Sequence, residues 1–182
     1  ETLFDDSDWS EANTGIGYDN STKYIPHLGE GGDVKAAMRG VNASIYIRVP
    51  FTLNDASGVS DLILRMKWED GFIAYLNGTK IESLSAPENP VWNSNSSSNR
   101  SNENDVITFF DYPVTGPLQK GQNILAIQGL NGSKNSSDFL VSPELIAKKT
   151  DLNSPKNGYF LNPTPETLNG ERIDGLVSDT KF

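Results

Sequence analysis

Apolar and polar residues alternate with a period of two in several segments of the chain, as expected for half-buried β-strands. The clearest alternations place on one side Ile45, Ile47, Val49 and Phe51 in residues 44–52, and Leu62, Leu64, Met66 and Trp68 in residues 62–68. Residues 106–112, 123–130 and 139–147 predict further strands, the last interrupted by Pro143. Helical periodicity is nearly absent, although residues 34–39 could form one or two helical turns. The pattern predicts an all-β fold.

Turn signals separate these strands. Glu69-Asp70-Gly71 predicts a tight turn, stabilised by Asp70 and with a positive φ at Gly71, that joins residues 62–68 and 72–76 into a β-hairpin. Asn77-Gly78 predicts a second turn, followed by a short strand at residues 80–83. Seven or more short strands joined in this way predict a two-layer antiparallel β-sandwich.

Several bulky residues are expected at defined places in this sandwich. Trp68 continues the inward face of its strand, and Tyr18 follows two glycines that allow a tight entry into the core. Trp9 is expected to pack as a lid on the core. Pro50 cannot donate to a strand ladder, so it predicts an edge strand or a bulge.

The chain divides by composition into two parts. Residues 1–148 carry the strand pattern and are expected to form the β-sandwich. Residues 149–182 are rich in Asn, Pro and Gly and lack periodicity, which predicts an irregular C-terminal tail, a linker partly packed on the sandwich. The chain opens on Glu1 without a signal peptide and is interpreted as a piece of a larger protein.

Charge and cysteine content narrow the possible partners. The formal net charge of -9 disfavours binding to nucleic acid or to an anionic membrane surface. No apolar run approaches the roughly 20 residues of a membrane-spanning helix. The chain has no cysteine, which removes disulfides, thiolate metal sites and cysteine nucleophiles. This composition fits a bacterial extracellular protein, and nothing in it indicates an obligate oligomer.

Two segments together carry a family resemblance. WEDGFIAYLNG, beginning at Trp68, and LQKGQNILAIQGLN, beginning at Leu118, resemble the corresponding parts of galactose-binding-domain-like jelly rolls. Such modules are accessory domains of bacterial glycosidases and of large secreted proteins, including planctomycete ones. The resemblance covers roughly residues 3–148. It implies a secreted or cell-surface, monomeric, non-catalytic jelly roll that binds a polysaccharide or glycoconjugate and works beside neighbouring domains.

A long polar stretch, residues 85–104, is the best candidate for a binding loop. Sugar sites combine an aromatic face with planar polar groups, and Trp92 has polar neighbours that leave it little core to join. The alternative is that Trp92 plugs the loop onto the sandwich and that the polar side chains are merely solvated. The candidate ligand-binding residues are Trp92, Asn93, Asn95, Arg100, Tyr75 and Asn131.

A structural calcium ion is a further expectation. Jelly-roll binding modules often hold one, and Asp6 and Asp19 near the start could join Glu144 on the last strand as oxygen ligands. The alternative is that these are solvated surface acids, since no EF-hand pattern is present.

Catalytic signatures are absent from the sequence. His27 is the single histidine, no G-x-S-x-G motif occurs, and no acid/base pair of carboxylates stands out. The prediction is therefore a non-catalytic carbohydrate-binding accessory module. The main alternative is a structural spacer or adhesion module without a free sugar ligand. The third is a hydrolase or lyase, which would need two carboxylates converging in a cleft.

Overall fold

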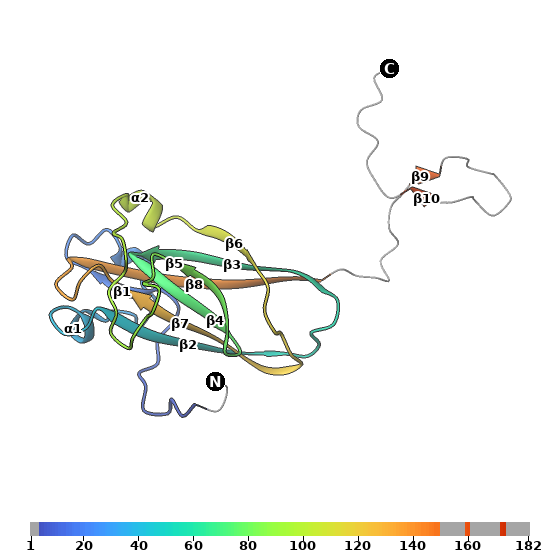
Figure 1. Cartoon of the computed structure of the whole chain (residues 1–182), viewed down its shortest axis with the longest axis horizontal. Coiled ribbons are helices and arrows are strands. Elements are labelled where there is room, and N and C mark those ends of the chain that lie inside the picture. Colours follow the sequence, from blue (N-terminus) through green and yellow to red (C-terminus); the bar gives the residue numbers. More distant parts are fainter. Residues whose placement is uncertain (1–3, 150–158, 161–171, 174–182) are drawn as a thin grey trace, which may run out of the picture. The chain divides into compact units, whose positions relative to one another are not determined.

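The computed structural model describes residues 4–149, 159–160 and 172–173, and eight of its strands form two antiparallel four-stranded sheets (Figure 1). These strands are β1 (Ile16–Asp19), β2 (Ser44–Leu53), β3 (Val59–Glu69), β4 (Gly71–Leu76), β5 (Thr79–Leu84), β6 (Phe110–Val114), β7 (Gly121–Leu130) and β8 (Asp138–Lys149). The short helices are η1 (Ile25–His27), α1 (Lys35–Met38) and α2 (Glu103–Val106).

The sheets have the strand orders β1-β8-β3-β6 and β2-β7-β4-β5. The predicted all-β, two-layer antiparallel sandwich is therefore confirmed, and the strand orders are consistent with a jelly roll. The first sheet is called here the βA sheet and the second the βB sheet.

The chain splits into two compact units at the end of β8. The first, Glu1–Lys149, contains the sandwich. In the second, β9 (Tyr159–Phe160) and β10 (Arg172–Ile173) pair antiparallel. The prediction that residues 149–182 form a linker packed on the sandwich falls almost wholly outside the described residues and stays a prediction.

The core lies between the two sheets and is built by the predicted alternation. Leu64, Met66 and Trp68 of β3 face Phe72 and other apolar side chains of the βB sheet. Burial of these side chains is the main source of stability for such a fold. Trp68 is buried as predicted, its ring meets Phe72 edge-on at 5.6 Å, and its indole N–H donates to the Tyr112 hydroxyl at 2.9 Å. Tyr18 is also buried, as predicted.

The predicted hairpin around Glu69 and Asp70 is wrong. β3 pairs with β6 and β8, whereas β4 pairs with β5 and β7, so the chain crosses from one sheet to the other between β3 and β4. Gly71 does not have a positive φ. It is needed for close packing instead, because a Cβ there would lie 2.9 Å from the Leu84 carbonyl oxygen. The true hairpin joins β4 and β5, where Asn77 and Gly78 both have positive φ, as type I′ turns require.

Two other strand predictions need adjustment. The strand predicted at residues 106–112 begins at Phe110, and residues 103–106 form α2, whose first turn is capped by the Asn102 side chain. β8 runs unbroken through Pro143. Because β1 pairs with residues 138–141 alone, one edge of β8 is unpaired beyond that point and tolerates a residue without an N–H. Pro50 lies on the edge strand β2, as predicted.

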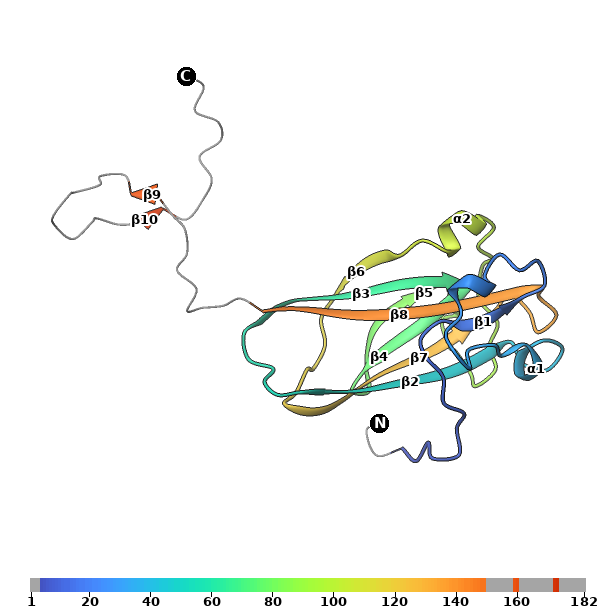
Figure 2. The ribbon, with the colours of Figure 1, turned by 180° about the vertical axis from the view of Figure 1, so that it is seen from behind.

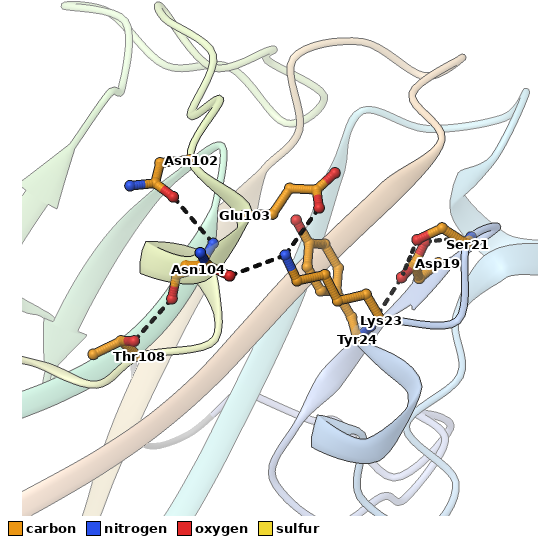
Figure 3. Close-up of polar contacts among 8 residues, drawn as sticks. All are labelled: Asp19, Ser21, Lys23, Tyr24, Asn102, Glu103, Asn104 and Thr108. Atoms are coloured by element: carbon orange, nitrogen blue, oxygen red, sulfur yellow. Dashed lines mark hydrogen bonds and ion pairs between the residues drawn. The ribbon is translucent and has the colours of Figure 1, made fainter.

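One end of the βA sheet is covered on its outer face by two segments, residues 20–28 with η1 and residues 102–108 with α2 (Figure 3). Lys23 joins them, since its ammonium group lies 3.0 Å from Glu103 Oε2 and 3.2 Å from Asn104 Oδ1. Beneath them Tyr24, Val106 and Leu140 form a small second core. This cover buries polar groups at the same end of the sheet.

Candidate functional site

The outer face of the βB sheet carries a hollow of about 530 Å³. The outward positions of β2, β4 and β7, together with the N-terminal segment, line most of it. The main lining residues are Trp9, Tyr46, Arg48, Tyr75, Ala126 and Gln128. Strand alternation explains the sheet's share, because the inward neighbours Ile45, Ile47 and Leu125 pack into the core.

Strand register produces the depth of the hollow. Arg48 of β2 lies opposite Ala126 of β7, and Ala126 lies opposite Tyr75 of β4. A methyl group thus stands between two large side chains in the middle of the sheet. In the next row Tyr46 of β2 lies opposite Gln128 of β7. The floor of the hollow is therefore β7, and the aromatic rings of its neighbouring strands form the sides.

The N-terminal segment Phe4–Trp9, called here the strap, forms another wall. In both views it runs outside the sandwich along the side of β2 (Figures 1 and 2). Asp6 Oδ2 accepts from Arg48 Nε at 2.6 Å, and the Phe4 ring lies 5.3 Å from Arg48 Cζ. The rings of Phe4 and Trp9 meet edge-on at 5.6 Å. Trp9 is 40% exposed, so the prediction that it lies on the core as a lid is wrong.

Trp92 stands beside the hollow on a backbone that the sheet holds in place. The Tyr46 hydroxyl donates to the Trp92 carbonyl oxygen at 3.0 Å, and Gln128 Nε2 donates to that of Val91 at 2.9 Å. The Trp92 side chain is nevertheless exposed, with 72% of the residue accessible to solvent. The alternative in which Trp92 plugs the loop onto the sandwich is therefore wrong. An exposed indole on a fixed backbone is suited to contact with a ligand.

Asn93, a predicted ligand contact, instead fastens this loop to β2. Its Oδ1 accepts from the backbone N–H groups of Ala43 at 2.8 Å and Ser44 at 3.1 Å. The Ser44 hydroxyl in turn donates to the Ser94 carbonyl oxygen at 2.6 Å. The amide of Asn93 thus holds Trp92 in position, and Asn95 remains exposed next to it.

Arg100 and Asn131, which were predicted as ligand-binding residues, do not line the hollow. The Arg100 guanidinium lies 4.1 Å from the Trp68 ring centroid and donates to the Trp68 carbonyl oxygen. Asn131 is fully buried and donates through Nδ2 to the Tyr18 hydroxyl and the Asp138 carbonyl oxygen. Both side chains satisfy buried backbone or hydroxyl groups, a role that sequence composition does not distinguish from ligand binding.

Of the predicted ligand contacts, Tyr75 lines the hollow itself. Among the described residues, neither its hydroxyl nor the indole N–H of Trp9 has a hydrogen-bond partner, so both are available to a ligand. Burial and the nearby Tyr75 raise the pKa of Tyr46, which keeps its phenol neutral at physiological pH. Sequence reasoning missed Tyr46 and the site of Trp9, although Tyr46 stood on the outward side of its predicted strand.

The three predicted calcium ligands lie apart. Asp6 pairs with Arg48 beside the βB sheet, whereas Asp19 and Glu144 belong to the βA sheet. Asp19 faces Asp138 at the start of β8, and Glu144 lies six positions further on, roughly 20 Å away. The prediction that these three share one ion is wrong. Within the described part of the chain no group of three or more metal-ligating side chains occurs, and calcium binding itself stays a prediction.

Three carboxyl groups lie at the end of the βA sheet that residues 20–28 and 102–108 cover. Burial, and secondarily the charge of Asp138, raise the pKa of Glu69 to about 8, and burial also raises the pKa of Asp138. For Asp19, burial acts to raise the pKa, but hydrogen bonds from the N–H groups of Tyr24 and Ser21 hold it below its ordinary value (Figure 3). Glu69, Asp138 and Asp19 lie on the βA sheet and not at the hollow, so we expect their titration to affect the stability of the fold.

The imidazole of His27 lies beside Lys67. Its Nδ1 lies 3.3 Å from the ammonium group of Lys67, and burial followed by this charge lowers the pKa of the imidazole. A triad histidine would instead need a carboxylate to orient it.

In the described part of the chain no helix has the length and apolar character needed to span a membrane. Comparisons with protein-family models, with curated proteins and with solved structures returned no match to this chain, so the hollow and the exposed Trp92 are the grounds on which its function is inferred.

Proposed function

We propose that this chain is a non-catalytic carbohydrate-binding module and that its site is the hollow on the βB sheet together with Trp92. The observation that carries the proposal is the set of aromatic side chains around an open hollow, with Trp92 exposed on a backbone tied to Tyr46 and Gln128. The proposal agrees with the resemblance to galactose-binding-domain-like modules.

The chemistry of the hollow suits a sugar. Aromatic rings cover the apolar C–H face of a pyranose, and the hydroxyl of Tyr75 and the indole N–H of Trp9 can bond to ring hydroxyls. Trp92 extends the aromatic surface beyond the hollow, so a ligand longer than a single ring could contact both the hollow and Trp92. One such site gives affinities of roughly micromolar to millimolar Kd, and tethering to neighbouring domains would increase the avidity.

Alanine at Trp92 or at Tyr75 is expected to weaken glycan binding by about tenfold each, because each change removes one stacking surface. A glycan array identifies the ligand, and isothermal titration calorimetry with that glycan gives the dissociation constants. Phe110→Ala is the matched control, since Phe110 is a partly exposed aromatic on the βA sheet and should leave binding unchanged.

Two outcomes would contradict this proposal. A blank array with a cooperatively folded sample would favour a structural spacer without a free ligand. Equal losses of affinity from the Phe110 variant and the Trp92 variant would remove the site from the βB sheet.

A further inference from the structure

Resting on the proposed function, we infer that the hollow selects uncharged glycans and that the ion pair between Arg48 and Asp6 sets this preference. Carbohydrate ligands divide into neutral chains and chains that carry carboxylate or sulfate groups. The two classes need different groups in the site, because an anionic sugar requires a cation that is not already compensated.

Among the described residues that line the hollow Arg48 is the charged one, and Asp6 of the strap pairs with it. Its Nε lies 2.6 Å from Asp6 Oδ2, and its side chain is 9% exposed. The ring of Phe4 lies over the same guanidinium group. A ligand carboxylate in the hollow would therefore meet a guanidinium whose charge is shared with Asp6, and it would be repelled by the more exposed Asp6 carboxylate.

The remaining polar groups of the hollow are uncharged. Among the described residues they are the phenols of Tyr46 and Tyr75, the indole N–H of Trp9 and the amides of Asn77 and Gln128. Such uncharged groups form hydrogen bonds with the neutral hydroxyls of a sugar. They carry no positive charge that would offset the desolvation of a carboxylate. The formal net charge of -9 adds a long-range repulsion toward polyanions.

The test compares cello-, manno- and laminari-hexaose with their C6-oxidised, uronate-containing forms, each titrated into the native chain. These pairs share their linkages and differ in charge. We expect the native chain to bind at least one neutral hexaose about tenfold or more tighter than its oxidised partner.

Asp6→Asn removes the carboxylate that lies 2.6 Å from Arg48 Nε, and we expect it to reduce that preference by about fivefold to tenfold. Asp8→Asn is the matched control, because it changes the net charge equally within the strap while Asp6 still pairs with Arg48; it should keep the native preference. The double variant Asp6→Asn/Arg48→Gln loses the strap contact but leaves no extra charge, so it should recover the neutral preference.

Each outcome decides the question. Tighter binding of an oxidised hexaose by the native chain would overturn the neutral preference while leaving a carbohydrate-binding module in place. An unchanged preference in Asp6→Asn, or the same shift in Asp6→Asn and the double variant, would overturn the role of the ion pair. Absence of binding to every hexaose and to every glycan of the array would overturn the proposed function, and this inference with it.

Discussion

The Glu69→Gln variant is expected to become more stable than the native chain as the pH rises. The difference between their free energies of unfolding should be about 3 kcal/mol larger at pH 8 than at pH 5. Glu69 is 6% exposed, and its Oε2 has no well-formed hydrogen bond among the described residues. The hydroxyl of Tyr24 is buried without a partner in the same way. A protonated carboxyl, or an amide of the same shape, is the form that this site accommodates.

The direction of the pH dependence follows from the raised pKa of Glu69. In the unfolded chain the carboxyl titrates near its ordinary pKa of 4.5, whereas burial and the Asp138 charge raise the pKa to about 8 in the folded protein. Below pH 4.5 both states are protonated and the full stability is present. Between pH 4.5 and pH 8 the unfolded chain releases its proton first, so the folded state loses stability as the pH rises. The raised pKa of Asp138 acts in the same direction.

Urea denaturation of the native chain and of Glu69→Gln at several values between pH 5 and pH 8 measures this effect. Tyr24→Phe is the control, because it removes the buried hydroxyl but leaves the carboxyl, so the stability should still fall between pH 5 and pH 8. Parallel stability curves for the native chain and Glu69→Gln would show that Glu69 is not the group that titrates.

Alanine at Asp70 is expected to lower the free energy of unfolding by about 3 kcal/mol. The Asp70 side chain is buried and holds two distant loops. Its Oδ1 accepts from the backbone N–H of Arg100 at 2.8 Å, and its Oδ2 accepts from the backbone N–H of Gly132 at 2.7 Å. Its removal leaves both N–H groups without their acceptor. The same change loosens the end of the loop that carries Trp92, so weaker glycan binding should accompany the loss of stability.

Chemical denaturation at pH 7 gives the change in stability, and amide hydrogen exchange at Arg100 and Gly132 shows whether the two contacts are released. Asp33→Ala is the matched control, because Asp33 accepts a single exposed backbone bond from Lys35 at the start of α1. That change should cost about 1 kcal/mol or less. Similar losses in the two variants, with protection retained at Gly132, would contradict the anchoring role of Asp70.

Local patterns in the sequence accounted for much of the fold. Alternation in residues 44–52 and 62–68 identified the inward faces of β2 and β3, because a strand turns every second side chain to the same side. Asn77-Gly78 identified the β4–β5 hairpin through the positive φ that both positions require. The polar neighbours of Trp92 favoured its exposure but left open the alternative in which it plugs the loop onto the sandwich.

Tertiary structure decided which strands pair and which polar side chains are used internally. Alternation gives a strand its faces but not its partners, so β3 and β4 read as a hairpin although they lie in different sheets. Asn93, Arg100 and Asn131 sit in polar stretches, where composition does not reveal that neighbouring backbone groups need their hydrogen bonds. The hollow depends on long-range register in the same way, since it exists because β2, β7 and β4 bring Ala126 between Arg48 and Tyr75.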